Sequence, residues 1–180
     1  MLQITIPATE QWDEKNQVFV KTDEQVLRLE HSLVSLHKWE SKWHKSFLFT
    51  KEKTYEETLD YIKCMTLTQN VNPDVYYCLT NENITQINEY IADPMTATYI
   101  YEDEKKGINR DKVTAELIYY WMISLGIPFE CQKWHLNQLL ALIKVCNVKN
   151  SPKKRMSNRD ILSRNKALNE ARKKSMHTRG

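Results

Sequence analysis

The chain has 180 residues, of which 41% are hydrophobic and 27% are charged, and its formal net charge is +3 at pH 7. This hydrophobic content can build a core, so global disorder is excluded, and the length fits one domain with an appendage. Three glycines and five prolines favour long helices over many short strands. Apolar stretches end well before about 18 residues, and no secretory pattern opens the sequence, so neither a membrane span nor export is expected.

The first residues alternate between apolar and polar side chains in two short segments. Residues 2–6 (LQITI) and residues 17–21 (QVFVK) are separated by a polar link. This pattern predicts a short β-hairpin. The hairpin is expected to pack against helices, because a two-stranded hairpin is only marginally stable alone. The β-branched and aromatic stretch 95–103 is a candidate for one extra short strand.

The next part of the chain shows helical spacing of apolar residues. A first helix is predicted to begin near Asp23 and to end in the segment HKWESKW, which places Trp39 and Trp43 on one face. Thr54, followed three residues later by Glu57, predicts the capped start of a second helix. Thr80 is a candidate cap for a third helix.

The most apolar part of the chain, residues 111–147, predicts two further helices. Gly126 can end the first of them in a left-handed conformation, and Pro128 suits the first turn of the second. The short link between them predicts an antiparallel helical hairpin at the centre of the domain. The expected fold is therefore mainly α, with a helical domain over residues 1–150.

Residues 151–180 differ from the rest in charge. They hold ten Lys or Arg and two Asp or Glu, a net charge of +8, so the first 150 residues carry −5. This pattern predicts a basic, partly helical C-terminal tail that orders on a partner. The tail lacks aromatics for base stacking and a clean apolar stripe for a membrane. A solvated tail that keeps the protein soluble or docks on an acidic partner is therefore favoured over a nucleic-acid-binding tail. Candidate contact residues are Lys153, Lys154, Arg155, Arg159 and Arg164.

Catalytic and metal-binding patterns are missing from the sequence. There is no glycine-rich phosphate loop, no G-x-S-x-G and no H-E-x-x-H. The four cysteines form no C-x-x-C pair, which favours free thiols in a reducing compartment. Cys131 and His135 have ligand spacing, but two residues make a poor metal site. We expect no enzyme activity, no cofactor and no bound metal.

The stretch HKWESKWHKSFL interleaves aromatic and cationic residues. Two interpretations remain open for Trp39, Trp43 and Phe47: packing in the core, or an exposed anchor for a partner protein. Trp43 and Phe47 are the better anchor candidates because they stand near the predicted helix end among charged neighbours.

Several long segments resemble one family. They are LEHSLVSLHKWESKWHKSFL, MTATYI, ELIYYWMISLGIPFECQKWHLNQLLALIKVCN and SPKKRMSNRDILSRNKALNEARK. Together they resemble tail assembly chaperones of long-tailed, siphovirus-type double-stranded DNA phages over nearly the whole chain. One departure is Ser46, where the family pattern has proline.

The resemblance implies a binding role in the host cytoplasm rather than catalysis. Such chaperones coat the tape measure protein, keep it soluble during tail assembly and are displaced by tail tube protein. Self-association is a further option. The alternatives are a structural tail, neck or baseplate component of the virion, a nucleic-acid-binding phage protein that acts through its basic tail, and a protein sensed by bacterial immunity.

Overall fold

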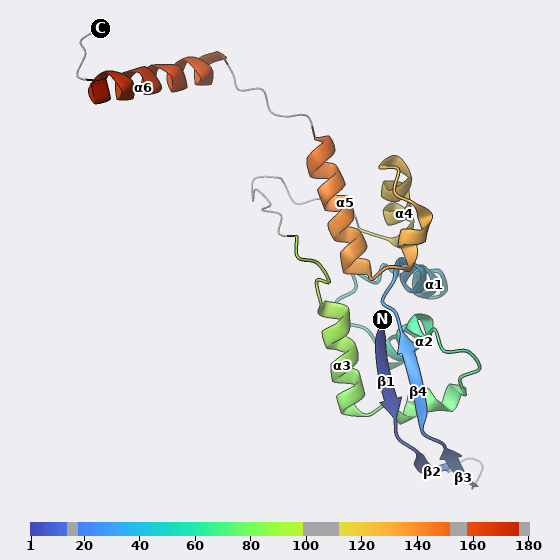
Figure 1. The fold of residues 1–180 in the computed structure, drawn as a ribbon. Coiled ribbons are helices and arrows are strands. Elements are labelled where there is room, and N and C mark those ends of the chain that lie inside the picture. The colour runs from blue at the N-terminus through green and yellow to red at the C-terminus, as the bar shows by residue number, and fades with distance from the viewer. Residues whose placement is uncertain (14–17, 99–111, 152–157, 177–180) are drawn as a thin grey trace. The chain divides into compact units, whose positions relative to one another are not determined.

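The computed structural model describes residues 1–13, 18–98, 112–151 and 158–176 (Figure 1). Helices dominate it and antiparallel strands occupy the N-terminal part, which confirms the predicted mainly α class with an N-terminal hairpin. The chain divides into two compact units, Met1–Val148 and Lys149–Gly180. Each unit is described by itself.

The N-terminal strands form two ladders in one common register. Strand β1 (Leu2–Ile6) pairs with β4 (Gln25–Leu29), and β2 (Thr9–Asp13) pairs with β3 (Val18–Thr22). The predicted pairing of residues 2–6 with 17–21 is therefore wrong. The β1–β4 pairing places the buried side chains on one face, where they join the core; these are Ile4, Ile6, Leu27 and Leu29.

The first helix begins about ten residues later than predicted. Helix α1 (Leu33–Trp43) follows Ser32, whose side chain accepts a hydrogen bond from the Ser35 backbone N–H while Ser35 caps Ser32 in return. Residues 25–29 are strand rather than helix because Leu27 and Leu29 alternate inward beside β1. Sheet pairing thus overrides a spacing that also fits a helix.

The second and third helices begin at the predicted caps. Helix α2 (Tyr55–Met65) has the Thr54–Glu57 capping box, and α3 (Asn81–Ala92) is capped by Thr80. A short 3-10 helix, η1 (Pro73–Cys78), lies between them. Of the candidate extra strand, residues 95–98 are not in a strand, and residues 99–103 lie outside the described residues.

The predicted last helix of the domain is divided into two elements. Helix α4 (Ala115–Ser124) is followed by Gly126 in the left-handed region at φ +67°, as predicted. The 3-10 helix η2 (Phe129–Lys133) and helix α5 (Leu136–Asn150) then replace one continuous helix. The interruption arises because His135 forms a β-bridge with Ser32, which requires extended backbone.

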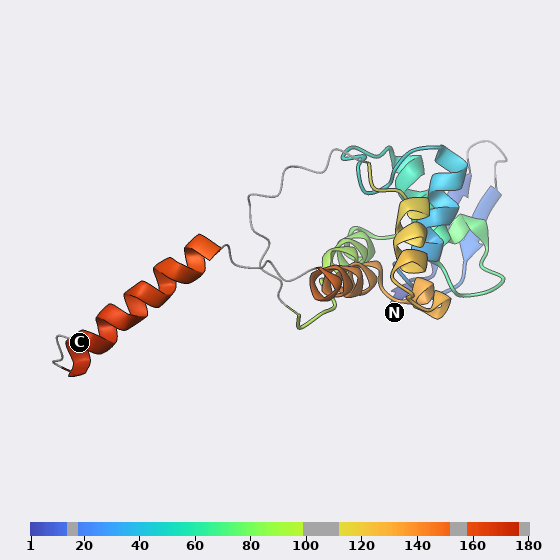
Figure 2. The same ribbon diagram turned by 90° about the horizontal axis from the view of Figure 1, so that it is seen from above.

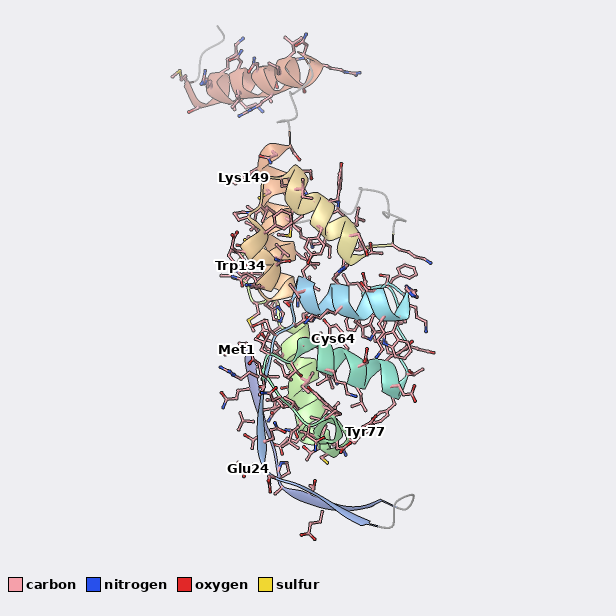
Figure 3. All side chains as sticks on the ribbon, turned by 90° about the vertical axis from the view of Figure 1, so that its right-hand side faces the viewer. Met1, Glu24, Cys64, Tyr77, Trp134 and Lys149 are labelled. Carbon is pink, nitrogen blue, oxygen red and sulfur yellow. The ribbon has the colours of Figure 1, made fainter. Side chains whose placement is uncertain are left out.

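The core of the first unit is built around α1. This helix lies between α4 and α2, as Figures 2 and 3 show. Leu33, Leu36 and Trp39 are fully buried there. They meet Met65 of α2 and Met122 of α4 in one hydrophobic cluster.

The second unit contains helix α6 (Asn158–Met176), whose described side chains are all exposed. It carries most of the basic residues of the tail in helical form. Within the described residues, no helix is both long enough and apolar enough to cross a membrane.

Candidate partner-binding site

Two of the three predicted aromatic anchors lie in the core. The Trp39 ring is fully buried, and its Nε1 donates a hydrogen bond of 2.8 Å to the backbone oxygen of Glu57. Phe47 is 8% exposed and stacks on Tyr61 with 3.8 Å between ring centroids. Neither ring is therefore exposed for the predicted partner contact, because Trp39 lies on the buried face of α1 and the turn after α1 folds Phe47 inward.

Trp43 is only partly buried, but the protein holds it in place. Its Nε1 donates a hydrogen bond of 3.0 Å to Oδ2 of Asp60 on α2. Lys42 forms an ion pair with the same carboxylate and stands 5.6 Å from the centre of the Trp43 ring. Lys42 thus neutralises the Asp60 carboxylate. Part of the Trp43 indole remains at the surface beside this ion pair.

The predicted basic contacts belong to the second unit. Arg159 and Arg164 lie on α6 and are exposed. Lys153, Lys154 and Arg155 lie outside the described residues. Exposed arginines on a helix suit an acidic surface, but they define no shaped site by themselves.

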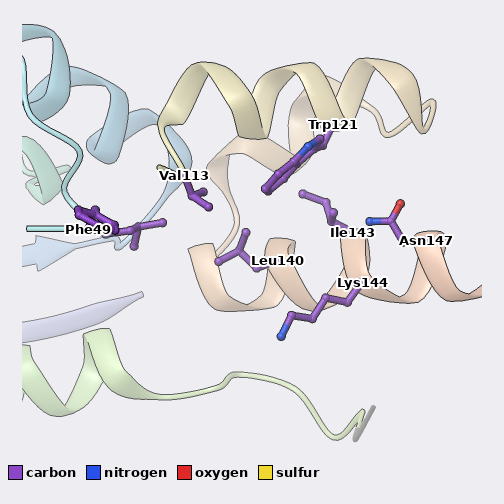
Figure 4. A pocket seen from close by; sticks show the side chains of 8 residues that line it. Phe49, Val113, Trp121, Leu140, Ile143, Lys144 and Asn147 are labelled. Carbon is purple, nitrogen blue, oxygen red and sulfur yellow. The ribbon is translucent and has the colours of Figure 1, made fainter. Parts of the chain in front are cut away.

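A shaped apolar groove lies instead between α4 and α5. Figure 4 shows side chains of both helices pointing into this space, with Phe49 at one end. The groove has a volume of about 560 Å³. Six apolar residues and two polar ones line it: Leu48, Phe49, Val113, Trp121, Leu140, Ile143, Lys144 and Asn147.

A buried carboxylate holds one end of the groove together. Glu40 of α1 is 7% exposed, and its Oε1 accepts a hydrogen bond of 2.8 Å from the Phe47 backbone N–H. Its Oε2 accepts one of 2.7 Å from the Ala115 N–H at the start of α4, where a negative charge is favourable. Burial raises the pKa of Glu40, while these two N–H groups act in the opposite direction. Glu40 therefore joins the Phe47 turn to α4.

Ser46 makes a second link across the same end. Its Oγ donates a hydrogen bond of 2.6 Å to the Val113 backbone oxygen and accepts one of 3.3 Å from the Phe49 N–H. A proline at this position would have no such hydroxyl. In this chain, Ser46 orients Phe49 and Val113 on the groove wall.

Helix α4 is apolar on nearly every side. Ile118 and Met122 face the core, and Trp121 faces the groove. Tyr120 and Ile123 are nevertheless 63% and 64% exposed. Helices that are apolar all round are normally buried, so the exposed Tyr120 and Ile123 side chains make this side of α4 an unusual apolar surface.

Two lysines stand at the groove. Lys144 is one of its described lining residues, and Lys112 Nζ stands 5.5 Å from the centre of the Phe49 ring. Within the part of the chain that the structure describes, no carboxylate lines the groove.

A second polar group of residues is sealed within the core. His31 Nδ1 lies 2.5 Å from the Tyr61 hydroxyl, and burial beside His135 lowers the pKa of His31 to about 3. His135 donates from Nε2 to the Tyr90 backbone oxygen at 3.0 Å and accepts at Nδ1 from the Asn137 N–H. These hydrogen bonds satisfy buried rings, and the His31 ring stays neutral at neutral pH.

The sulfur atoms offer little chemistry. None of the four cysteines forms a disulfide, and burial raises the pKa of Cys64 to about 11, which disfavours a thiolate. Cys131 and His135 are both buried. Among the described residues, no group of three or more His, Cys, Asp or Glu could hold a metal ion.

Sequence reasoning missed the groove residues because their spacing also fits a closed helical hairpin. The all-round apolar character of ELIYYWMI and the apolar run FLF were the available signs. No protein-family model, no curated protein and no solved structure matches this chain.

Proposed function

We propose that this protein is a non-enzymatic phage tail assembly chaperone that binds the tape measure protein in the host cytoplasm. The observation that carries the proposal is the open apolar groove between α4 and α5. A tape measure protein is a long helix with apolar stripes that aggregate when exposed. A groove beside an exposed apolar helix is the kind of surface that covers such a stripe.

The size of the groove suits reversible binding. Helix α4 has ten residues and is about 15 Å long, so it can cover only two to three turns of a bound helix. An interface of this size is small. Its affinity is modest because few contacts are available to offset the translational and rotational freedom that the two proteins lose on binding. Weak, repeated contacts would let tail tube protein displace the chaperone.

Co-expression with the tape measure protein tests the proposal. We expect the tagged chaperone to keep the tape measure protein soluble and to retain it in a pull-down. Leu48 and Phe49 are 42% and 61% exposed, so L48S with F49S should abolish this effect without loss of the core. The matched control is Tyr55→Ser, which changes an aromatic residue that is 66% exposed and does not line the groove.

Two results would contradict the proposal. An insoluble tape measure protein in the presence of the wild-type chain would remove the chaperone role. Detection of the protein in purified virions by mass spectrometry, without any complex, would favour a structural tail component instead. The exposed basic helix α6 keeps nucleic-acid binding as a second candidate, which predicts binding that weakens steeply with salt.

A further inference from the structure

We infer that the buried His31 side chain forms an acid-sensitive clasp, which holds the start of α5 to the junction of β4 and α1. Helix α5 is one wall of the groove, so loss of this clasp detaches that wall. The clasp acts on the wall itself and does not depend on which partner the groove binds.

Helix α5 is tied to the rest of the unit by hydrogen bonds at its first residues. The Leu136 N–H donates a hydrogen bond of 2.7 Å to the His31 backbone oxygen, and His135 forms the β-bridge with Ser32. The Asn137 side chain ties the same turn to the end of α3. The residues of α5 that line the groove follow about one to three turns later, so their position depends on how this first turn is held.

The His31 ring lies where that attachment is made. It is 2% exposed, and its centroid stands 5.1 Å from the centroid of the His135 ring. Its Nδ1 lies 2.5 Å from the Tyr61 hydroxyl of α2, and the centroid of the Phe47 ring is 6.5 Å away. Within the described part of the chain, no carboxylate forms a hydrogen bond with this ring. A proton on His31 would therefore place a charge in the core without a counter-ion.

The titratable groups around His31 do not compensate such a charge. Tyr61 stays neutral because burial raises its pKa, and a positive His135 repels a proton on His31. The carboxylates of Glu30 and Glu40, which stand before and after His31 in the chain, already accept hydrogen bonds from other groups. Burial, and then the neighbouring His135, lower the pKa of His31 to about 3.

Acid therefore acts against the clasp. Detachment of α5 removes His135 from the His31 ring and lets water reach it. Since an ordinary histidine has a pKa of 6.5, the His31 ring takes up a proton between pH 6.5 and about 3 only when it is released from its buried place. The free energy that holds α5 in place thus falls as the pH falls through this range. The equilibrium constant for detachment rises about tenfold for each pH unit below 6.5.

Hydrogen exchange of the full chain tests the clasp. Protection factors, which correct for the intrinsic pH dependence of exchange, are measured by NMR at pH 7.5 and 5.5 for the amides of α5 and α2. We expect α5 to exchange through an opening of its own that is more frequent than the opening of α2, and its protection to fall about tenfold at the lower pH.

One variant and a matched control separate the His31 ring from other effects of acid. His31→Asn keeps a polar atom near the position of Nδ1 but takes up no proton in this range, so the protection of α5 should be equal at both pH values. The control, His44→Asn, removes an exposed histidine from a left-handed conformation that asparagine tolerates, and it should retain the tenfold fall.

Equal protection of α5 at both pH values in the wild-type chain would overturn the inference. So would exchange of α5 and α2 at equal protection, which would show unfolding of the whole unit rather than release of one wall. If His31→Asn does not fold, the NMR chemical shift of the His31 ring is followed in the wild-type protein. No titration of that shift between pH 7.5 and 5.5 supports the clasp, and an ordinary titration in the folded protein overturns it.

Discussion

The buried carboxylate of Glu40 is the most sensitive point of the groove. Its two oxygens accept hydrogen bonds from the backbone N–H groups of Phe47 and Ala115, which lie close in sequence to the lining residues Leu48 and Val113. Glu40→Gln keeps the shape of the side chain but leaves only one oxygen. One of the two N–H groups must then face the amide NH₂ without an acceptor.

The expected loss of stability follows from the number of Glu40 oxygens that remain to accept these hydrogen bonds. A buried donor that loses its acceptor costs about 1–3 kcal/mol, so we expect Glu40→Gln to lower the free energy of unfolding by about 2 kcal/mol. Glu40→Ala leaves both N–H groups without an acceptor and should lower the free energy of unfolding by about 4 kcal/mol. Since small domains unfold at about 5–15 kcal/mol, both losses are large enough to measure.

Urea unfolding followed by tryptophan fluorescence measures these losses, because the Trp39 ring lies in the core of the same unit. The matched control is Glu89→Gln on an exposed position of α3, which should stay within about 0.5 kcal/mol of wild type. If Glu40→Gln also stays within that range, the two hydrogen bonds do not stabilise the groove and the reasoning is refuted. A loss of stability with unchanged capture of the tape measure protein would separate folding from binding.

Three further predictions concern pH, backbone conformation and the tail. Burial raises the pKa of Glu40 above its ordinary value of 4.5. Between the pKa of the unfolded chain and the raised pKa of the folded state, the folded protein binds more protons, so its free energy of unfolding falls as the pH rises through that range. Urea titrations at pH 4.5 and 7 should therefore show a larger advantage of wild type over Glu40→Gln at the lower pH. Gly126→Ala should cost about 1 kcal/mol, because φ is +67° while no atom lies within 4 Å of the added Cβ, and the melting temperature reports it. Removal of residues 151–180 should leave the urea midpoint of the first unit unchanged, since these residues fall in the second unit, and any nucleic-acid binding should disappear with them.

Local hydrogen bonding explains which elements could be predicted. The Thr54–Glu57 capping box and the Thr80 cap depend on side chains within one helical turn, and the structure contains both. The left-handed Gly126 is equally local, because few other residues adopt that conformation easily. Such features need no knowledge of the rest of the fold.

The errors arose where distant segments decide the backbone. Leu29 fits both the helical spacing that continues to Leu33 and the alternation with Leu27, and pairing with β1 selects the strand. Likewise, the bridge between His135 and Ser32 divides the predicted last helix into η2 and α5. The spacing of apolar residues cannot reveal either contact, because each depends on a partner about 20 to 100 residues away in the chain.

The candidate site shows the same division between local and distant information. In the stretch HKWESKWHKSFL, Trp39 and Phe47 are buried in the core, whereas the groove is lined by Leu48 at the end of the stretch and by Phe49 directly after it. The inward path of the chain depends on Glu40, which accepts hydrogen bonds from backbone N–H donors in two different segments, at Phe47 and at Ala115. Sequence spacing alone carries no sign of that role.

The hydrogen bonds of Glu40 and Ser46 bear on how a small groove can still capture a partner. Because they tie the turn around Phe49 to α1 and to the start of α4, part of one groove wall is ordered before any partner arrives. A preformed wall lowers the entropy cost of binding, so a small apolar contact can suffice for capture. The same small area keeps dissociation fast. Under the proposed function, a chaperone that must be displaced along a polymerising tube requires this combination of an ordered wall and a small contact area.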